Sequence, residues 1–174
     1  YVLISHGHED HLADAEHILQ RTNATVVSNY EIAMWYVAKG IQKFHPMNFG
    51  GQWNFDFGSV KFVKAEHSRV LPDGTYGGNP GGFVVKSKYG NFYYAGDTAL
   101  HYDMKLIGEY EKLHFAVLPI GDNFTMGIED ALRATDFIEC NRIIGVHFDT
   151  FPYIKIDKED AIKRFAAKGK ELIL

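Results

Sequence analysis

Apolar residues occur along the chain in two patterns, short continuous runs and segments with helical spacing. The helical pattern places apolar residues three and four positions apart, as Leu12, Ala15 and Leu19 do. We predict helices at 10–21, 31–39, 103–110, 129–138 and 158–167. We predict strands at 1–4, 24–27, 53–57, 60–65, 83–85, 92–95, 115–119, 142–146 and 171–174. Hairpins mixed with β-α units indicate an α/β protein whose helices cover the outer faces of sheets.

Both ends of the sequence have the pattern of a core strand. Residues 1–4 are apolar with no charged segment before them, and residues 171–174 begin another strand and stop without a turn. A chain rarely begins inside a core strand. We therefore expect one domain over residues 1–174, as a segment cut from a longer protein at its N-terminus and at its C-terminus.

Composition narrows the class of protein. The 174 residues fit one domain, and 46% hydrophobic with 23% charged residues is typical of a soluble globular chain. The net charge of −4 offers no polybasic surface, so a nucleic-acid partner is not implied. The single cysteine, Cys140, cannot close an intramolecular disulfide, and no apolar run approaches the roughly 18 residues of a membrane span. We expect a cytoplasmic protein without a membrane partner.

The most informative segment follows the first predicted strand. Residues 6–11 read His-Gly-His-Glu-Asp-His, and nine histidines in the whole chain make such a cluster unusual. His6, His8 and Asp10 are two residues apart, so an extended loop projects them the same way, and His11 follows at the start of a helix. Imidazole nitrogen and carboxylate oxygen are ligands of intermediate divalent metals. Crowded imidazoles repel one another when protonated, which favours a metal site over a polar surface loop.

This hexapeptide resembles the HxHxDH signature of the metallo-β-lactamase fold. That superfamily adds a histidine after a hairpin strand, an aspartate in a Gly-Asp-Thr turn and a last histidine after a late strand. The sequence has His67, Asp97 and His147 in those contexts and in that order. Each follows an apolar strand, so all would meet at one edge of the sheets. The resemblance implies an αββα four-layer sandwich, here lacking the N-terminal strands that family members place before the signature.

The wider context is similar to a narrower group, the metal-dependent hydrolases related to the ascorbate-phosphate lactonases. The segments that carry this resemblance are Glu66-His67-Ser68, 78–82, 94–98, 118–122 and 147–152. They are distributed over essentially the whole chain. The group implies a lactone or a phosphate ester as substrate, whereas the residue spacing alone indicates only the metals.

The resemblance also implies how the ligands divide between two ions. One ion would be held by His6, His8 and His67, the other by Asp10, His11 and His147, and Asp97 would bridge them. Two ions about 3.5 to 4 Å apart can share a water, lower its pKa and polarise the bond under attack. The bridging hydroxide would be the nucleophile, and Asp10 would be the catalytic residue that orients it or accepts a proton.

The predicted donors include no thiolate, because Cys140 lies outside every ligand motif. A set of histidines and aspartates suits zinc, manganese, iron or nickel. We expect two divalent ions, zinc or manganese first, with iron and nickel also compatible. His45, His101, Asp122 and Asn123 stay open between a structural role and a contact with the substrate.

Together these features predict a metal-dependent hydrolase acting on a small polar ester, lactone or phosphoester. A di-iron oxidoreductase of the same fold is the first alternative, but that branch typically carries Glu where this chain has His8. An RNA-processing nuclease would need a basic surface, which the composition does not indicate. A purely structural metal site is a third alternative, although seven candidate ligands leave open positions for water. An incomplete sheet would favour a homo-oligomer.

Overall fold

The strands of the protein form two sheets, described here from a computed structural model that covers residues 1–174. The smaller sheet is parallel, with the order β1 (Val2–Leu3), β2 (Val26–Asn29) and β3 (Phe44–Met47). The larger sheet has the order β10-β9-β8-β7-β6-β5-β4. Its strands are β4 (Gln52–Phe55), β5 (Gly58–Lys64), β6 (Gly81–Ser87), β7 (Gly90–Tyr94), β8 (Phe115–Pro119), β9 (Arg142–Val146) and β10 (Glu171–Ile173). Strands β4 to β7 pair antiparallel, and β7 to β10 pair parallel.

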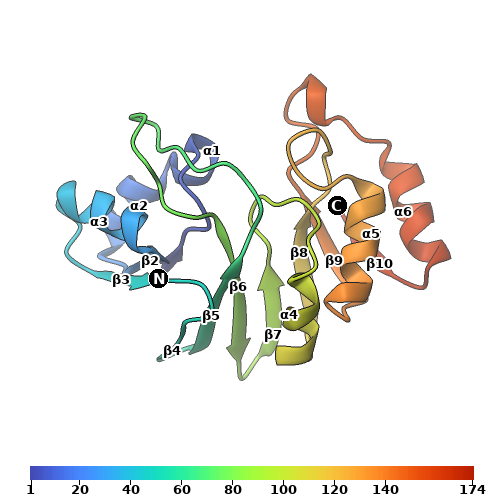
Figure 1. Ribbon diagram of the computed structural model, residues 1–174, viewed down its shortest axis with the longest axis horizontal. Helices are drawn as coiled ribbons and strands as arrows, with labels where there is room; N and C mark the ends of the chain where they lie inside the picture. The colour runs from blue at the N-terminus through green and yellow to red at the C-terminus, as the bar shows by residue number, and fades with distance from the viewer.

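Helices cover the outer face of each sheet (Figure 1). The smaller sheet carries α1 (Glu9–Leu12), α2 (Ala15–Thr22) and α3 (Tyr30–Ala38). The larger sheet carries α4 (Met104–Tyr110), α5 (Ile128–Phe137) and α6 (Lys158–Ala167), and the 3₁₀ turn η1 (Pro152–Ile154) precedes α6. The layers therefore run helix, sheet, sheet, helix, and the predicted αββα sandwich is confirmed.

Three apolar clusters hold the layers together. Leu19 and Ile32 pack on Val26 between the first helices and the smaller sheet. Between the two sheets, buried side chains of β2, β3, β5 and β6 meet, among them Phe62 and Phe83. The largest cluster lies between the larger sheet and α4, α5 and α6. Burying these faces from water supplies the main stabilisation of the sandwich.

One segment that we predicted as a single helix is broken into two helices. The segment 10–21 forms two helices, α1 and α2, with the break at Ala13 and Asp14. Leu12, Ala15 and Leu19 are nevertheless all buried. The apolar spacing therefore persists across the break, and this is why the pattern does not reveal it. The break lets the short α1 carry Asp10 and His11 at the site while α2 packs on the core.

One strand was not predicted at all. β3 pairs with β2 and contains Pro46, which cannot donate a ladder hydrogen bond. Of its four residues only Met47 is buried, so the apolar signal is weak. Proline is tolerated there because β3 is an edge strand of the smaller sheet. The other predicted strands and the remaining helices are confirmed within a few residues.

An apolar cavity of about 980 Å³ lies between the sheets beside β1, which is the other edge of the smaller sheet. Tyr1, Phe55, Phe57 and Phe92 line it.

None of the helices combines the length and the apolar character needed to cross a bilayer.

Candidate metal centre

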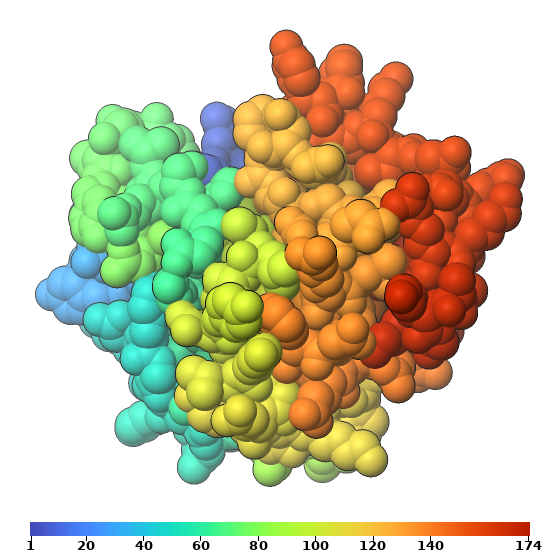
Figure 2. Space-filling model, turned by 45° about the vertical axis from the view of Figure 1, so that its right-hand side comes forward, coloured from blue at the N-terminus to red at the C-terminus, as the bar shows by residue number.

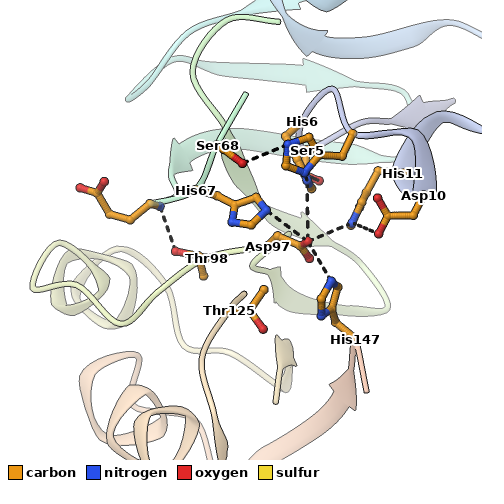
Figure 3. A network of polar contacts seen from close by, with 12 residues as sticks. Ser5, His6, Asp10, His11, His67, Ser68, Asp97, Thr98, Thr125 and His147 are labelled. Atoms are coloured by element: carbon orange, nitrogen blue, oxygen red, sulfur yellow. Dashed lines mark hydrogen bonds and ion pairs between the residues drawn. The ribbon is translucent and has the colours of Figure 1, made fainter. Parts of the chain in front are cut away.

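Four strand ends deliver the predicted ligands to one edge of the sandwich. The segment His6–His11 follows β1, His67 follows β5, Asp97 follows β7 and His147 follows β9. Figure 3 shows the histidines pointing inward from these loops toward Asp97. The structure thus brings together the residues that the sequence placed far apart.

Asp97 lies at the centre of the cluster. Its Oδ2 is 3.2 Å from Nε2 of His147, 3.3 Å from Nε2 of His11, 3.5 Å from Nε2 of His67 and 3.7 Å from Nε2 of His6. The residue is only 4% exposed. A buried carboxylate surrounded by four imidazoles is a concentrated set of donors for a cation.

The remaining two predicted ligands flank this centre. His8 Nδ1 lies 3.2 Å from His6 Nε2, and Ser68 Oγ hydrogen-bonds His8 Nε2 at 3.1 Å. Asp10 Oδ2 lies 3.4 Å from His11 Nε2, and its side chain is 62% exposed. Asp10 is therefore the carboxylate of the cluster that solvent and a substrate reach most easily.

The donor atoms divide into two groups that share Asp97. One group is His6, His8, His67 and Asp97, and the other is Asp10, His11 and Asp97, with all donor atoms of a group within 4.8 Å of one another. This division matches the one that the resemblance implied, with one difference. His147 contacts Asp97 but lies outside the group of Asp10 and His11.

Burial keeps two of these imidazoles neutral, those of His6 and His67. Burial lowers the pKa of His6 to about 2, and the neighbouring His11 adds to the effect. Burial also lowers the pKa of His67. His147 differs, because its hydrogen bond to Asp97 outweighs burial and raises its pKa. For Asp97, burial acts to raise the pKa, but hydrogen bonds from His11 and His147 dominate and hold it well below the usual range.

The cluster fits a divalent metal. A neutral imidazole and an ionised carboxylate are the protonation states that metal ligation requires. Asp97 is kept ionised, and His6 is kept neutral. The cleft around the cluster is lined by no lysine or arginine that would repel a cation. The sole cysteine, Cys140, is buried in the apolar cluster between the larger sheet and its helices.

The backbone beside Asp97 has little room to move. Gly96 has φ +63°, and a Cβ built on it would lie 2.7 Å from Ser5 Cβ. His147 also lies in the left-handed region, with φ +56°, which is uncommon for a residue with a side chain. Such conformations persist only where the surrounding structure enforces them, and they concentrate at functional sites.

Several residues of the site had no predicted role. The cleft has a volume of about 780 Å³ and is lined, besides the predicted ligands, by Ser68, Tyr94, Phe124, Thr150 and Phe151, among others. Burial raises the pKa of Tyr94, so its hydroxyl stays protonated and able to donate. Ser68, Tyr94, Thr150 and Phe151 belong to segments that the resemblance singled out, and this was the available signal in the sequence. No pattern in the sequence pointed to Phe124.

The four residues left open fall outside the cleft. His45 packs against Trp53 and Phe55, with ring centroids 4.9 and 5.1 Å apart, in a structural role. His101 lines a separate cavity of about 270 Å³, and both of its ring nitrogens are buried without a hydrogen-bond partner. Asp122 and Asn123 form the tight turn before Phe124, in which the Asn123 N–H donates to Asp122 Oδ1.

Comparison with known proteins decides the family. Residues 1–148 match the family model described as the beta-lactamase superfamily domain. The chain belongs to this superfamily. A metal-dependent hydrolase of Flavobacterium johnsoniae is 59% identical over 174 residues, which is 100% of this chain and 77% of that protein. A metal-dependent hydrolase of Thermus thermophilus is 46% identical, over 98% of this chain and 75% of the relative.

A solved structure gives the same result. A metallo hydrolase of the archaeon Ignicoccus hospitalis matches with a TM-score of 0.89 and 32% identity, over 99% of this chain and 74% of that one. The chain spans about three quarters of the length of these relatives. The protein is thus a metal-dependent hydrolase of the metallo-β-lactamase superfamily, as the sequence analysis predicted.

Proposed function

We propose that the protein hydrolyses an ester, a lactone or a phosphoester with the help of two divalent ions. The observation that carries this proposal is the position of Asp97, which is shared by two groups of donors. One carboxylate between two groups is the arrangement expected of a bridge in a dinuclear site. The seven residues that hold the ions are His6, His8, Asp10, His11, His67, Asp97 and His147.

Two bound ions supply a water acidified toward neutral pH and polarise the bond under attack. The residues around them hold the ligands in place. Ser5 hydrogen-bonds His6 Nδ1 at 3.0 Å, and Ser68 hydrogen-bonds His8 Nε2, so each imidazole is oriented through its second nitrogen. Thr98 hydrogen-bonds the backbone of Glu66 and so positions the next residue, His67.

Asp10 has the geometry of the group that moves a proton. Asp10 lines the cleft, its side chain is exposed to solvent, and its Oδ2 lies 3.4 Å from His11 Nε2. A carboxylate in this position can accept a proton from the attacking water and return it to the leaving group. Tyr94, which stays protonated, lines the same cleft and can donate a hydrogen bond to an oxygen of the substrate.

The ions are zinc or manganese in our proposal, with iron and nickel compatible with the same donors. The location and the partners are also proposals. One free cysteine fits a reducing compartment, so we propose a cytoplasmic enzyme. Its partner is a small-molecule substrate rather than a nucleic acid or a membrane, and a homo-oligomer stays a prediction.

Elemental analysis of the purified full-length protein tests this function when it is combined with assays on a panel of lactones and a generic phosphodiester. Each assay is run with and without added zinc or manganese. We expect about two ions per chain and turnover that the metal restores. Two redox-active irons without hydrolysis would instead favour the di-iron oxidoreductase. Failure to bind metal under any loading condition would overturn the ligand assignment.

A further inference from the structure

Two aromatic side chains stand at the metal cleft without being buried. Phe124 and Phe151 both line the cleft, with their ring centroids 5.9 Å apart and the rings tilted by 45°. They are 50% and 40% exposed. Tyr153 extends the group, because its ring lies edge-on to Phe124 with the centroids 6.5 Å apart. The three residues form what we call the aromatic rim.

The rim joins two loops, one of which also carries the predicted ligand His147. Phe124 lies between β8 and α5, and Phe151 lies between β9 and α6, in the loop that begins with His147. In Figure 2 these two segments, in light orange and red-orange, rise next to each other at the upper edge of the molecule. An apolar group of the substrate seated on the rim would therefore lie beside the metal ligands.

Hydrogen bonds hold the loop of Phe124 in place. The Asp122 N–H donates to the Met126 carbonyl at 3.1 Å and closes the turn. The Met126 N–H donates to the Thr98 carbonyl at 3.0 Å, which ties the turn to the residue after Asp97. Met126 is itself almost fully buried. The turn is thus anchored in the core through Met126, while the side chain of Phe124 points outward to solvent.

The loop of Phe151 is anchored in a similar way. The Asp149 N–H donates to the Ile154 carbonyl at 2.8 Å, and the Ile156 N–H donates to Asp149 Oδ1 at 3.1 Å. Ile154 is buried, whereas Phe151 and Tyr153 on the same loop are exposed. Two anchored loops that turn aromatic rings toward one cleft indicate a binding surface.

The charges of the cleft favour one class of substrate. Its lining contains no lysine or arginine, and its charged groups are the carboxylates of Asp10 and Asp97. Arginine and lysine are the side chains that form strong charge-assisted hydrogen bonds with a phosphate or a carboxylate group. Besides the predicted ligands, the polar side chains that line the cleft are the hydroxyls of Ser68, Tyr94 and Thr150, of which Ser68 also hydrogen-bonds His8. These suit a neutral carbonyl compound better than an anion.

We propose that the substrate is an uncharged ester or lactone with an aromatic group that packs against Phe124 and Phe151. This inference rests on the proposed hydrolase function and narrows its substrate class. Hydrolysis breaks the acyl C–O bond. The oxygen of water bonds to the acyl carbon, one of its protons passes to the leaving alcohol oxygen, and a carboxylic acid and an alcohol result. No oxidant or reductant takes part.

A matched pair of lactones tests the aromatic group. The metal-loaded full-length protein is assayed with γ-butyrolactone and with γ-phenyl-γ-butyrolactone. We expect kcat/KM for the phenyl lactone to be about tenfold higher or more, because the ring is desolvated against two aromatic side chains. Phe124→Ala and Phe151→Ala should each reduce this ratio severalfold, chiefly through KM for the phenyl lactone. Phenyl phosphate, which keeps the ring but adds charge, should be the poorest substrate.

The control variant is Phe44→Ala. Phe44 is 41% exposed, like Phe151, but it lies on β3 and does not line the cleft. This variant should keep the ratio between the two lactones unchanged. A fall in the ratio equal to that of Phe151→Ala would show that loss of any exposed phenylalanine has the effect, and would contradict the rim.

Binding of ketones that cannot be hydrolysed separates this inference from the proposed function. Titration calorimetry with 3-phenylcyclopentanone and cyclopentanone should show about tenfold tighter binding of the phenyl compound, and Phe124→Ala should remove the difference. Tight binding of 3-phenylcyclopentanone without hydrolysis of either lactone would support the aromatic rim and would overturn the proposal that the protein hydrolyses lactones. Equal binding and equal rates for both members of each pair would overturn the rim while leaving hydrolysis in place. Turnover of phenyl phosphate faster than that of the lactones would overturn the proposal that the substrate is uncharged.

Discussion

The backbone N–H of Glu66 donates a hydrogen bond to Thr98 Oγ1 over 3.0 Å. The Ala99 N–H donates back to the Glu66 carbonyl, also over 3.0 Å. This pair of bonds joins the loop that carries His67 to the loop that carries Asp97. Thr98 is fully buried, so water cannot replace its hydroxyl. The distance between two predicted ligands from different strands therefore depends on the Thr98 hydroxyl and on one backbone hydrogen bond.

Replacing Thr98 by valine should weaken both the fold and the metal site. The change keeps the shape of the side chain but leaves the Glu66 N–H without its partner, at a cost of about 1 to 3 kcal/mol in the free energy of unfolding. We also expect a lower affinity for metal, because His67 is no longer held. Urea unfolding and a metal titration check both effects. Thr98→Ser keeps the hydroxyl and should recover most of the loss, and a valine variant with normal metal affinity would contradict the role of Thr98.

Replacing Asp10 by alanine separates an enzyme from a structural metal site. Asp10 is exposed, so in an enzyme the metal-loaded variant should change its free energy of unfolding by less than about 0.5 kcal/mol, whereas a structural metal site would lose more stability. Turnover should fall by about a hundredfold or more if Asp10 moves a proton. Glu9→Ala, the neighbouring exposed acid, serves as the control and should keep its activity. Full activity of the Asp10 variant would show that the assignment is wrong.

Replacing Gly96 by alanine should displace Asp97. The new Cβ would lie 2.7 Å from Ser5 Cβ in a backbone conformation with φ +63°, so both strain and a clash result. We expect a loss of about 1 to 3 kcal/mol in stability together with weaker metal binding. Gly40 has φ +90° with nothing within 4 Å, so Gly40→Ala carries the strain without the clash. Thermal unfolding and metal affinity are measured for both variants. The difference between Gly96→Ala and Gly40→Ala then gives the contribution of the clash.

Acidification should remove metal and activity together. Protons compete with metal for the imidazoles, so metal affinity falls as pH falls. In the metal-free protein the hydrogen bond to Asp97 raises the pKa of His147, whereas burial lowers that of His6 to about 2. A raised pKa means proton uptake at a higher pH, so His147 is the first of these two to become unavailable. Metal content and activity measured between pH 8 and pH 5 should decline in parallel. Full activity after the metal is stripped would contradict the mechanism.

Local patterns in the sequence predicted most of the fold. Runs such as 115–119 and 142–146 became β8 and β9 with the predicted bounds, because short apolar runs flanked by polar turns fit a buried strand. The pattern failed where the local signal was weak or misleading. Pro46 concealed β3, and continuous apolar spacing concealed the break between α1 and α2.

The sequence by itself determined the chemistry of this protein. The run of histidine and aspartate at 6–11 supplied four of the predicted donors, and the motifs around His67, Asp97 and His147 supplied the rest, because residue type and local spacing are properties of the chain. Only the tertiary structure decided how the donors meet. Asp97 contacts His6, His11, His67 and His147 because four strands end at the same edge of two packed sheets. The sequence singled out the segment 147–152, which contains Phe151, but it did not show that Phe151 and Phe124 line one cleft, because the direction in which they point is set by hydrogen bonds between distant loops and the core.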